Sequence, residues 1–430
     1  MQEGAEIIRV LRAAGHQAWL VGGCVRDLLL GVPPQDFDVA TSARPEQIAG
    51  LFPAARPVGA HFGVMLVGEV EVATFRSDGV YADGRRPESV NYETKPDADA
   101  RRRDFTINGL FLDPFSGEVL DFVGGREDLA RRTVRAIGDA AVRFGEDHLR
   151  MLRAVRFAAR LDFSIDPATL AAIDPAAIRR IAVERVFAEL NRILGEGGAA
   201  RGMALLDRCG LLAELLPEVK AMQGVEQPAD WHPEGDVWVH TLALLRHMGA
   251  AGPGLAWGGL LHDVGKPVTQ TVTDRIRFNG HDRVGAEMAG RILRRLRAAG
   301  ELIERVEYLV SCHMRFLKLP KMKPATLKRF LRHEGFAELL ELHRLDCLAS
   351  SGRLGTYEYA RAQWEGLRPE ELRPAPLVTG RDVMALGVAP GPRIGELLRA
   401  LEEEQLEGNL STREEALAWL SRQAGGPAST

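Results

Sequence analysis

The chain has 430 residues, of which 46% are hydrophobic and 27% charged, and its formal net charge is −4. This composition is typical of a globular protein with several domains, and no apolar run approaches the ~20 residues that a membrane-spanning helix needs. The four cysteines have no CxxC spacing. That argues against a zinc ribbon or a disulfide framework and predicts a cytoplasmic protein. Because the net charge is not positive, any contact with nucleic acid has to come from local patches.

The order of the predicted elements indicates an α+β protein. Two predicted hairpins, 64–76 and 111–125, lie in the N-terminal part, where helices alternate with short strands. Beyond about residue 141 the strand signals nearly vanish and helical periodicity takes over. We therefore predict a small mixed-sheet head, an all-helical neck, a helical body and a helical tail. Their expected bounds are 1–140, 141–205, 206–370 and 371–430.

The first motif with chemical content is VGGCVRDLLLGVPPQDFDVATS, which contains Asp36 and Asp38. We predict a strand through both residues, which would put the two carboxylates on one face. Hard oxygen ligands on a rigid face suit Mg²⁺, which prefers a few carboxylates together with substrate phosphates. Gly22 and Gly23 precede a helix expected near residue 25, and such a turn offers backbone N–H groups to a triphosphate.

A third carboxylate, Glu71, lies in the predicted hairpin 64–76. Together with Asp36 and Asp38 it would hold two metal ions, one activating a 3′-hydroxyl and one stabilising pyrophosphate as it leaves. A DxD pair is also common in surface turns. The glycine turn, the strand context and Glu71 favour the catalytic interpretation.

The second motif is DADARRRDFTINGL. Arg102 and Arg103 offer guanidinium groups, which suit phosphate oxygens, and Asp104 offers an acceptor for a ribose hydroxyl. The alternative is a solvated run of charges. We expect FTIN to be an apolar strand that would fix these charges at the edge of the sheet.

The third motif is RFGEDHLRMLRAVRF, which we predict to be one helix. Asp147, Arg150 and Arg153 would then share a face at i, i+3 spacing. A carboxylate accepts from an exocyclic amine and an arginine donates to a ring nitrogen or carbonyl, so one Asp–Arg pair can accept C and A and reject G and U. An ordinary ion pair on a helix surface is the alternative.

These motifs together resemble the class II (bacterial and eukaryotic) tRNA nucleotidyltransferase and poly(A) polymerase family over nearly the whole chain. The resemblance implies template-independent addition of C and/or A, from CTP and ATP, to the 3′ end of tRNA, with Mg²⁺ at Asp36 and Asp38 and a supporting role for Glu71. It implies nucleotide contacts at Gly22, Gly23, Arg26, Arg102, Arg103, Asp104, Asn108, Asp147, Arg150, Arg153 and Arg156.

Two further segments match the family. DGVYADGRRPESV resembles the flexible loop that helps the site switch from C to A, and its intact Tyr81, Asp83, Arg86 and Pro87 disfavour an enzyme that adds only CC. VERVFAEL resembles a helix motif whose Glu184 and Arg185 look like scaffolding. An enzyme that adds only A, or a poly(A) polymerase, shares all these motifs and stays an alternative. A non-catalytic RNA-binding protein should have lost DxD or ED-x-x-R.

A fourth pattern lies in the body: His240, an adjacent His262–Asp263 pair, His281, His313 and Asp346. This spacing resembles the HD phosphohydrolase superfamily. The resemblance implies a second divalent metal (Mg²⁺, Mn²⁺ or Ni²⁺), a secondary phosphohydrolase activity and a phosphate-side role for Lys266. The implied ligands are His240, His262, Asp263, His281, His313 and Asp346. Satisfied core histidines are one alternative. Another is a phosphohydrolase whose head only binds RNA, against which the intact Asp36 and Asp38 argue. The sequence does not fix the oligomeric state.

Overall fold

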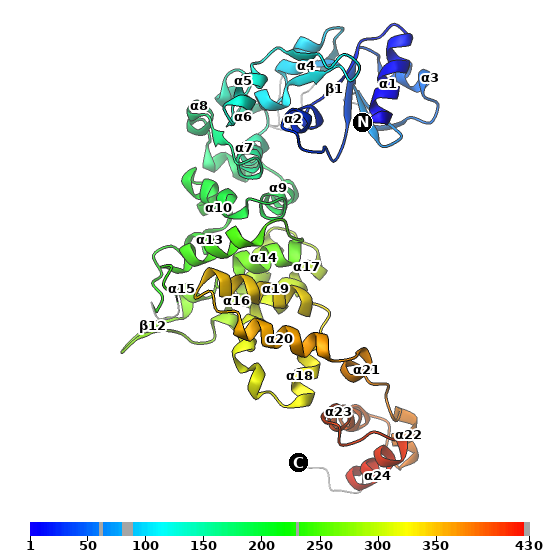
Figure 1. Ribbon diagram of the computed structural model, residues 1–430, viewed down its shortest axis with the longest axis vertical. Helices are drawn as coiled ribbons and strands as arrows, with labels where there is room; N and C mark the ends of the chain where they lie inside the picture. Colours follow the sequence, from blue (N-terminus) through cyan, green and yellow to red (C-terminus); the bar gives the residue numbers. More distant parts are fainter. Residues whose placement is uncertain (60–62, 80–88, 229–231, 425–430) are drawn as a thin grey trace. The chain divides into compact units, whose positions relative to one another are not determined.

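The computed structural model describes residues 1–59, 63–79, 89–228 and 232–424. The chain forms two compact units (Figure 1), of which the first comprises Met1–Lys220 with the short segments Met248–Ala251 and Arg295–Ala298. The second unit contains the remainder of the chain. Head and neck thus fall in one unit, and the division into four parts stays a prediction. Within the described residues, no helix has the length and apolar character needed to cross a bilayer.

The first unit is built on a seven-stranded mixed sheet, which confirms the predicted α+β class. Both predicted hairpins are present, as the antiparallel pairs β4–β5 and β8–β9. In spatial order the strands are β3 (Arg56–Gly59), β4 (Val64–Val67), β5 (Val70–Thr74), β2 (Asp38–Thr41), β1 (Ala18–Val21), β8 (Leu110–Leu112) and β9 (Val119–Asp121). A separate two-stranded ribbon pairs β6 (Arg76–Asp78) with β7 (Val90–Tyr92).

The sheet register brings two of the three predicted carboxylates, Asp38 and Glu71, side by side. β1 and β2 are antiparallel with Val21 opposite Asp38, and β2 and β5 are parallel with Asp38 beside Glu71. Burial of apolar residues fixes this register, because a slip by one residue would turn every side chain to the other face. The buried cluster consists of Val21, Ala40, Phe75, Ala100 and Phe111.

Helices complete the head. α1 (Gln2–Ala13) buries Ile7, Ile8 and Leu11 at helical spacing, as expected for one face of an amphipathic helix. The remaining head helices are α2 (Gly23–Leu29), α3 (Pro45–Leu51), α4 (Pro96–Arg101) and α5 (Gly125–Ala130).

Two predictions about the head are wrong in detail. β2 begins only at Asp38, so Asp36 lies in the bend before the strand, where Pro33 and Pro34 disfavour a ladder because proline has no N–H. FTIN is not a strand: Thr106–Asn108 forms the buried 3-10 turn η2, and β8 follows at Leu110. Asp104 explains this, since its carboxylate accepts from the Phe105 N–H and the Asn108 amide and so competes with strand pairing.

The neck is helical, but the predicted single helix over the third motif is wrong. It is divided into α6 (Ala140–Glu146) and α7 (Leu149–Arg160), and Asp147 lies between them. The Asp147 carboxylate accepts from the Leu149 N–H (3.1 Å), which starts the second helix. The other main helices in this part of the first unit are α9 (Val183–Gly195), α10 (Ala199–Arg208) and α11 (Leu211–Leu215).

The second unit is mostly helical, apart from the hairpin β12 (Gln270–Val272) and β13 (Ile276–Phe278). Its larger helices are α13 (Val237–Met248), α14 (Pro253–Leu261), α16 (His281–Arg295), α17 (Gly300–Cys312), α18 (Pro324–Leu331), α19 (Phe336–Ala349) and α20 (Gly355–Gly366). The predicted tail helices are confirmed as α22 (Gly380–Ala385), α23 (Pro392–Glu407) and α24 (Arg413–Ala424). They enclose a small core of their own that includes Leu397 and Leu401.

Candidate active site and metal centre

Three carboxylates lie near one another beside the middle of the head sheet, but among the described residues their oxygens do not converge within 4.8 Å as ligand atoms in the histidine-rich part of the chain do. Asp38 is half-buried at the start of β2, and Asp36 and Glu71 beside it are exposed. Burial, then the negative charges of Glu71 and Asp36, raise the pKa of Asp38 to about 6, against the lowering effect of Arg103. A divalent cation would relieve this crowding of negative charge, so the donor set fits a hard cation such as Mg²⁺.

The glycine turn after β1 lies directly against this acidic group. Gly22 has φ +75°, and a Cβ atom at this position would lie 3.1 Å from Arg103 Nη1 and 3.7 Å from Asp38 Oδ2. Because Gly22 has no side chain, the space between Asp38 and Arg103 stays open. α2 begins at the next residue, Gly23.

A buried carboxylate that the sequence analysis did not single out holds both predicted phosphate ligands. Asp99 is fully buried, and it accepts from Arg102 Nε (2.7 Å) through one oxygen and from Arg103 Nη2 (2.9 Å) through the other. Burial alone would raise the pKa of Asp99, but the two guanidinium charges outweigh it and lower the pKa. The two arginines are thus ordered before any ligand arrives.

The remaining head residues predicted to contact the nucleotide form a buried chain of polar contacts. Arg26 donates to Asn108 Oδ1 (2.8 Å) and pairs with Asp27 (2.7 Å), and Asn108 donates to Asp104 (3.1 Å). Asp104 also pairs with Arg153 of α7 (2.6 Å). Burial would raise the pKa of Asp104, but the Arg153 charge and the hydrogen bonds outweigh it and lower the pKa to about 2. In this structure these groups connect the head to the neck, and direct nucleotide contacts by them stay a prediction.

The predicted base-reading residues each have a partner within the chain. Asp147 forms two hydrogen bonds with Arg185 (2.7 and 3.2 Å), which supports the scaffolding role predicted for Arg185. Arg150 pairs with Glu146 at 2.5 Å. Arg156 lies deeper, in an ion pair with Glu189 (2.8 Å). The side chains of Asp147 and Arg150 keep exposed fractions of 17% and 11%, so Asp147 is partly buried and Arg150 is buried.

The flexible loop inferred from the sequence lies outside the described residues, since Tyr81, Asp83, Arg86 and Pro87 all fall within 80–88. β6 and β7 border this segment. The prediction drawn from the loop is therefore tested only by activity.

Comparison with known proteins identifies this arrangement. Residues 18–135 match the Poly A polymerase head domain family, residues 162–223 the family described as the probable RNA and SrmB-binding site of polymerase A, and residues 282–420 the putative tRNA nucleotidyltransferase domain 2. An A-adding tRNA nucleotidyltransferase of Deinococcus radiodurans is 38% identical over 436 residues, which is 95% of each chain. The chain belongs to the class II tRNA nucleotidyltransferase family.

Two further members of the class II family show how its activities vary among similar sequences. A CC-adding tRNA nucleotidyltransferase of Thermus thermophilus is 37% identical and covers 95% of this chain and 94% of its own. The crystal structure of a Bacillus stearothermophilus CCA-adding enzyme in complex with CTP superposes with a TM-score of 0.75 at 29% identity, covering 98% and 97% of the two chains. The present protein is thus a nucleotidyltransferase of a family that depends on divalent metal.

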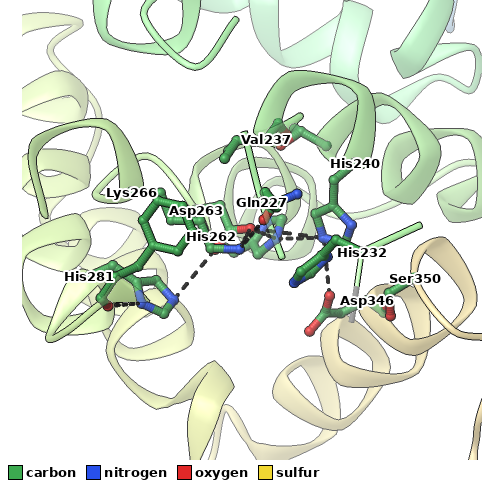
Figure 2. A network of polar contacts seen from close by, with 12 residues as sticks. Gln227, His232, Val237, His240, His262, Asp263, Lys266, His281, Asp346 and Ser350 are labelled. Carbon is green, nitrogen blue, oxygen red and sulfur yellow. Dashed lines mark hydrogen bonds and ion pairs between the residues drawn. The ribbon is translucent and has the colours of Figure 1, made fainter. Parts of the chain in front are cut away.

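The second unit of this nucleotidyltransferase contains a histidine cluster (Figure 2). All six predicted ligands converge, and among the described residues they form two groups, each with ligand atoms within 4.8 Å of one another. One group is His240, His262 and Asp346, and the other is Asp263, His281 and His313.

Distances within the cluster are those of groups that share a cation. The Nε2 atoms of His240 and His262 lie 3.2 Å apart, and those of His281 and His313 lie 3.3 Å apart. Two nitrogen ligands at about 2.1 Å from one ion are expected roughly 3.0–3.4 Å apart. Both separations fall in this range, so the residues fit a metal centre.

Electrostatics differ among the ligands of the cluster. Burial would lower the pKa of His240, but its contacts with Asp346 and Glu234 outweigh it and raise that pKa to about 9. Burial lowers the pKa of His313 to about 4, which keeps this imidazole neutral near pH 7. Burial would also raise the pKa of Asp263, but the charges of His262 and Lys266 outweigh it and lower the pKa far below its ordinary value. Lys266 Nζ lies 2.7 Å from Asp263 Oδ2.

A cavity of about 930 Å³ opens next to the cluster. Its lining includes the ligands Asp263, His281, His313 and Asp346. Lys266, Arg275 and Arg277 add positive charge, and Phe278, Met314 and Leu317 add apolar surface. The cavity can therefore admit an anionic ligand that also carries an apolar group.

Sequence reasoning missed the groups that support the ligands. Asp99 lies three and four residues before Arg102 and Arg103, and this helical spacing was a usable signal. Glu234, which lies between His232 and His240, accepts from both imidazoles, at 2.9 and 2.6 Å. A carboxylate two residues after a histidine has no comparable signature in the sequence.

Proposed function

We propose that the protein adds C and A, from CTP and ATP, to the 3′ end of tRNA and releases pyrophosphate, and that it acts in the cytoplasm, where its four free cysteines would stay reduced. The observation that carries the proposal is the meeting of Asp38, Arg103 and the Gly22 turn, with Glu71 in register beside Asp38. This arrangement offers metal ligands, a phosphate ligand and an open space at one point of the sheet.

Each residue would have a separate task in the reaction. Asp36 and Asp38 would hold Mg²⁺, which supplies the positive charge that lowers the pKa of the tRNA 3′-hydroxyl and stabilises pyrophosphate. Glu71 would support them from β5. Arg102 and Arg103, ordered by Asp99, would donate to the triphosphate oxygens.

Base selection would use Asp147 and Arg150. The carboxylate accepts from the exocyclic amine that C and A share, and the guanidinium donates to the adjacent ring acceptor. Because both side chains have partners within the chain, Arg185 and Glu146, an incoming base has to compete for their hydrogen bonds. That competition disfavours G and U, which offer no matching pattern.

An extension assay tests how many nucleotides the protein adds. Transcripts of tRNA that lack the last three, two or one nucleotides would be incubated with CTP alone, ATP alone or both, and the products resolved at single-nucleotide resolution. With both nucleotides present, we expect every transcript to be extended until it ends in CCA. Addition of A alone to the transcript ending in CC would instead identify an A-adding enzyme, and a long A tail would identify a poly(A) polymerase.

We propose a second activity, hydrolysis of phosphoesters at the histidine cluster with Mg²⁺, Mn²⁺ or Ni²⁺. The two ligand groups, Lys266 and the adjoining cavity support it. The test is hydrolysis of p-nitrophenyl phosphate and of a 2′,3′-cyclic nucleotide by the double variant Asp36→Ala, Asp38→Ala. Metal-dependent turnover that persists in this variant supports the proposal, and loss of turnover would assign the hydrolysis to the head instead.

A further inference from the structure

The four histidines of the cluster share one orientation. In each ring the Nδ1 atom faces an acceptor on the protein, and the Nε2 atom faces the other ligands. Three of the acceptors are backbone carbonyls: Gly259 O for His262 (2.9 Å), Phe278 O for His281 (2.8 Å) and Val310 O for His313 (2.6 Å). A carbonyl can only accept, so these contacts place the proton on Nδ1 and leave the Nε2 lone pair for a cation.

His240 is the exception. Its Nδ1 lies 2.6 Å from Glu234 Oε1, so its orientation depends on a carboxylate side chain and not on the backbone. His240 is fully buried at the same time, and its Nε2 lies 3.1 Å from Asp346 Oδ1 and 3.2 Å from His262 Nε2. A carboxylate behind a histidine ligand fixes its tautomer and raises its basicity toward metal.

The segment that carries Glu234 is built to hold it in place. Gly235 has φ +127°, a conformation that strongly favours glycine, and its carbonyl accepts from Gln227 Nε2 (3.4 Å). Asp236 caps α13, accepting from the Val239 N–H (2.7 Å), and it also accepts from the Gly224 N–H (2.6 Å). These contacts fix the two residues that follow Glu234 in the chain.

His232 adds a second contact to the same oxygen. Its Nδ1 lies 2.9 Å from Glu234 Oε1, and its ring stands edge-on to His240 with centroids 4.9 Å apart. His232 also lines the cavity beside the cluster. Glu234 thus connects a cavity-facing imidazole to a buried metal ligand.

We propose that Glu234 is the positioning residue of the second metal centre: it fixes the ring of His240 so that Nε2 faces the cation, and it orients His232 at the cavity wall. The inference rests on the proposal that the cluster binds a divalent cation. Without the Glu234 carboxylate, Nδ1 of His240 would have no hydrogen-bond partner among the described residues.

The experiment is a calorimetric titration of the full-length protein with Mn²⁺ and, separately, with Ni²⁺. All proteins carry Asp36→Ala and Asp38→Ala, so that the head carboxylates do not contribute. Glu234→Gln, which keeps the shape of the side chain, is compared with the unsubstituted Glu234 and with Glu226→Gln, a matched change at an exposed glutamate of the same connecting segment. We expect Glu234→Gln to weaken binding about tenfold to a hundredfold and Glu226→Gln to have no effect.

A second measurement separates positioning from general damage. Hydrolysis of p-nitrophenyl phosphate is followed against metal concentration for the same proteins and for Glu234→Asp. We expect the half-activating Mn²⁺ concentration of Glu234→Gln to rise by the same factor as its dissociation constant, while the rate at saturating Mn²⁺ stays close to that of the parent. Glu234→Asp, which keeps the charge, should recover part of the affinity.

The outcomes distinguish the two proposals. If the head double variant binds neither metal, the second metal centre itself is refuted. If it binds metal and Glu234→Gln binds equally tightly, the positioning role is refuted while the centre stands. A lower melting temperature of metal-free Glu234→Gln together with a lower saturated rate would assign Glu234 to the stability of the fold, which also overturns the inference.

Discussion

The head and the histidine cluster, each proposed to hold a divalent cation, offer opposite sets of ligands. The head offers carboxylates that repel one another and are partly exposed, and burial together with Glu71 and Asp36 raises the pKa of Asp38 to about 6. The cluster offers mostly nitrogen ligands, on four buried histidines whose rings are fixed from behind by backbone carbonyls and Glu234. A site that must accept and release a metal-bound triphosphate in each cycle gains from incomplete coordination. A site that keeps its cation gains when its ligands are already in place before the ion binds.

The largest effect is expected on nucleotide addition when Asp38 is changed. Asp38→Asn should reduce nucleotide addition about a thousandfold or more, because a metal ion contributes several kcal/mol to the transition state. Single-turnover extension of a tRNA transcript measures this. Phosphoester hydrolysis by the same variant should persist, and addition close to the parental rate would show that the head acids are not the catalytic ligands.

The cluster should be damaged by loss of a ligand without harm to the head. His313→Ala should weaken Mn²⁺ binding by at least about a hundredfold, since even groups behind a ligand are commonly worth tenfold to a hundredfold. Calorimetry in the Asp36→Ala, Asp38→Ala background gives the affinity. Extension assays with His313→Ala alone should give normal products, and a loss of both activities would contradict the independence of the two sites.

Substitutions at Gly22 and Gly31 test whether Gly22 is needed for the room beside Arg103 and Asp38 or only for its positive φ. Gly22→Ala should lower nucleotide addition about tenfold to a hundredfold, because the new methyl group would displace Arg103 and approach Asp38. Gly31→Ala is the matched control, since Gly31 has a similar φ of +72° but no atom within 4 Å of the new Cβ. Equal losses of rate in the two variants would mean that only the backbone matters.

Base selection is expected to respond more weakly. Arg150→Ala should reduce the preference for CTP and ATP over GTP and UTP about tenfold, since one such contact is worth about 1–3 kcal/mol. Arg143→Ala is the control, because Arg143 pairs with the same Glu146 (2.9 Å) without being a predicted base contact. Competition assays with mixed nucleotides measure the preference, and an unchanged preference in Arg150→Ala would remove Arg150 from base reading.

The last prediction concerns the stability of the fold and its dependence on pH. The pKa of Asp104 is lowered from 3.8 to about 2, so its ion pair stabilises the folded state above pH 3.8, and this contribution disappears as the pH falls toward 2. The difference corresponds to about 2 kcal/mol. Asp104→Asn should therefore unfold at lower urea concentration than the parent at pH 7, and the two should converge near pH 2. Glu118→Gln, in an exposed hairpin turn, should follow the parent, and a gap that persists at pH 2 would contradict the assignment.

Periodicity in the sequence placed Asp38 and Glu71 on two strands that could be neighbours, and the sheet pairs them in register. The predicted secondary structure was wrong where a carboxylate accepts a hydrogen bond from the nearby backbone. Asp104 turns FTIN into η2, and Asp147 divides a predicted helix, because both carboxylates accept from N–H groups close by in the chain. The partners of Arg150 and Asp147 also depend on helix geometry that composition does not encode.

Asp99 gives the two predicted phosphate ligands, Arg102 and Arg103, a shared anchor. One fully buried carboxylate orders two arginines, one through each oxygen. A substitution of Asp99 would remove the anchor of both guanidinium groups at once, so neither arginine could compensate for the other. Any natural exchange at this position should therefore come with a second acid nearby, and the two changes should be inherited together.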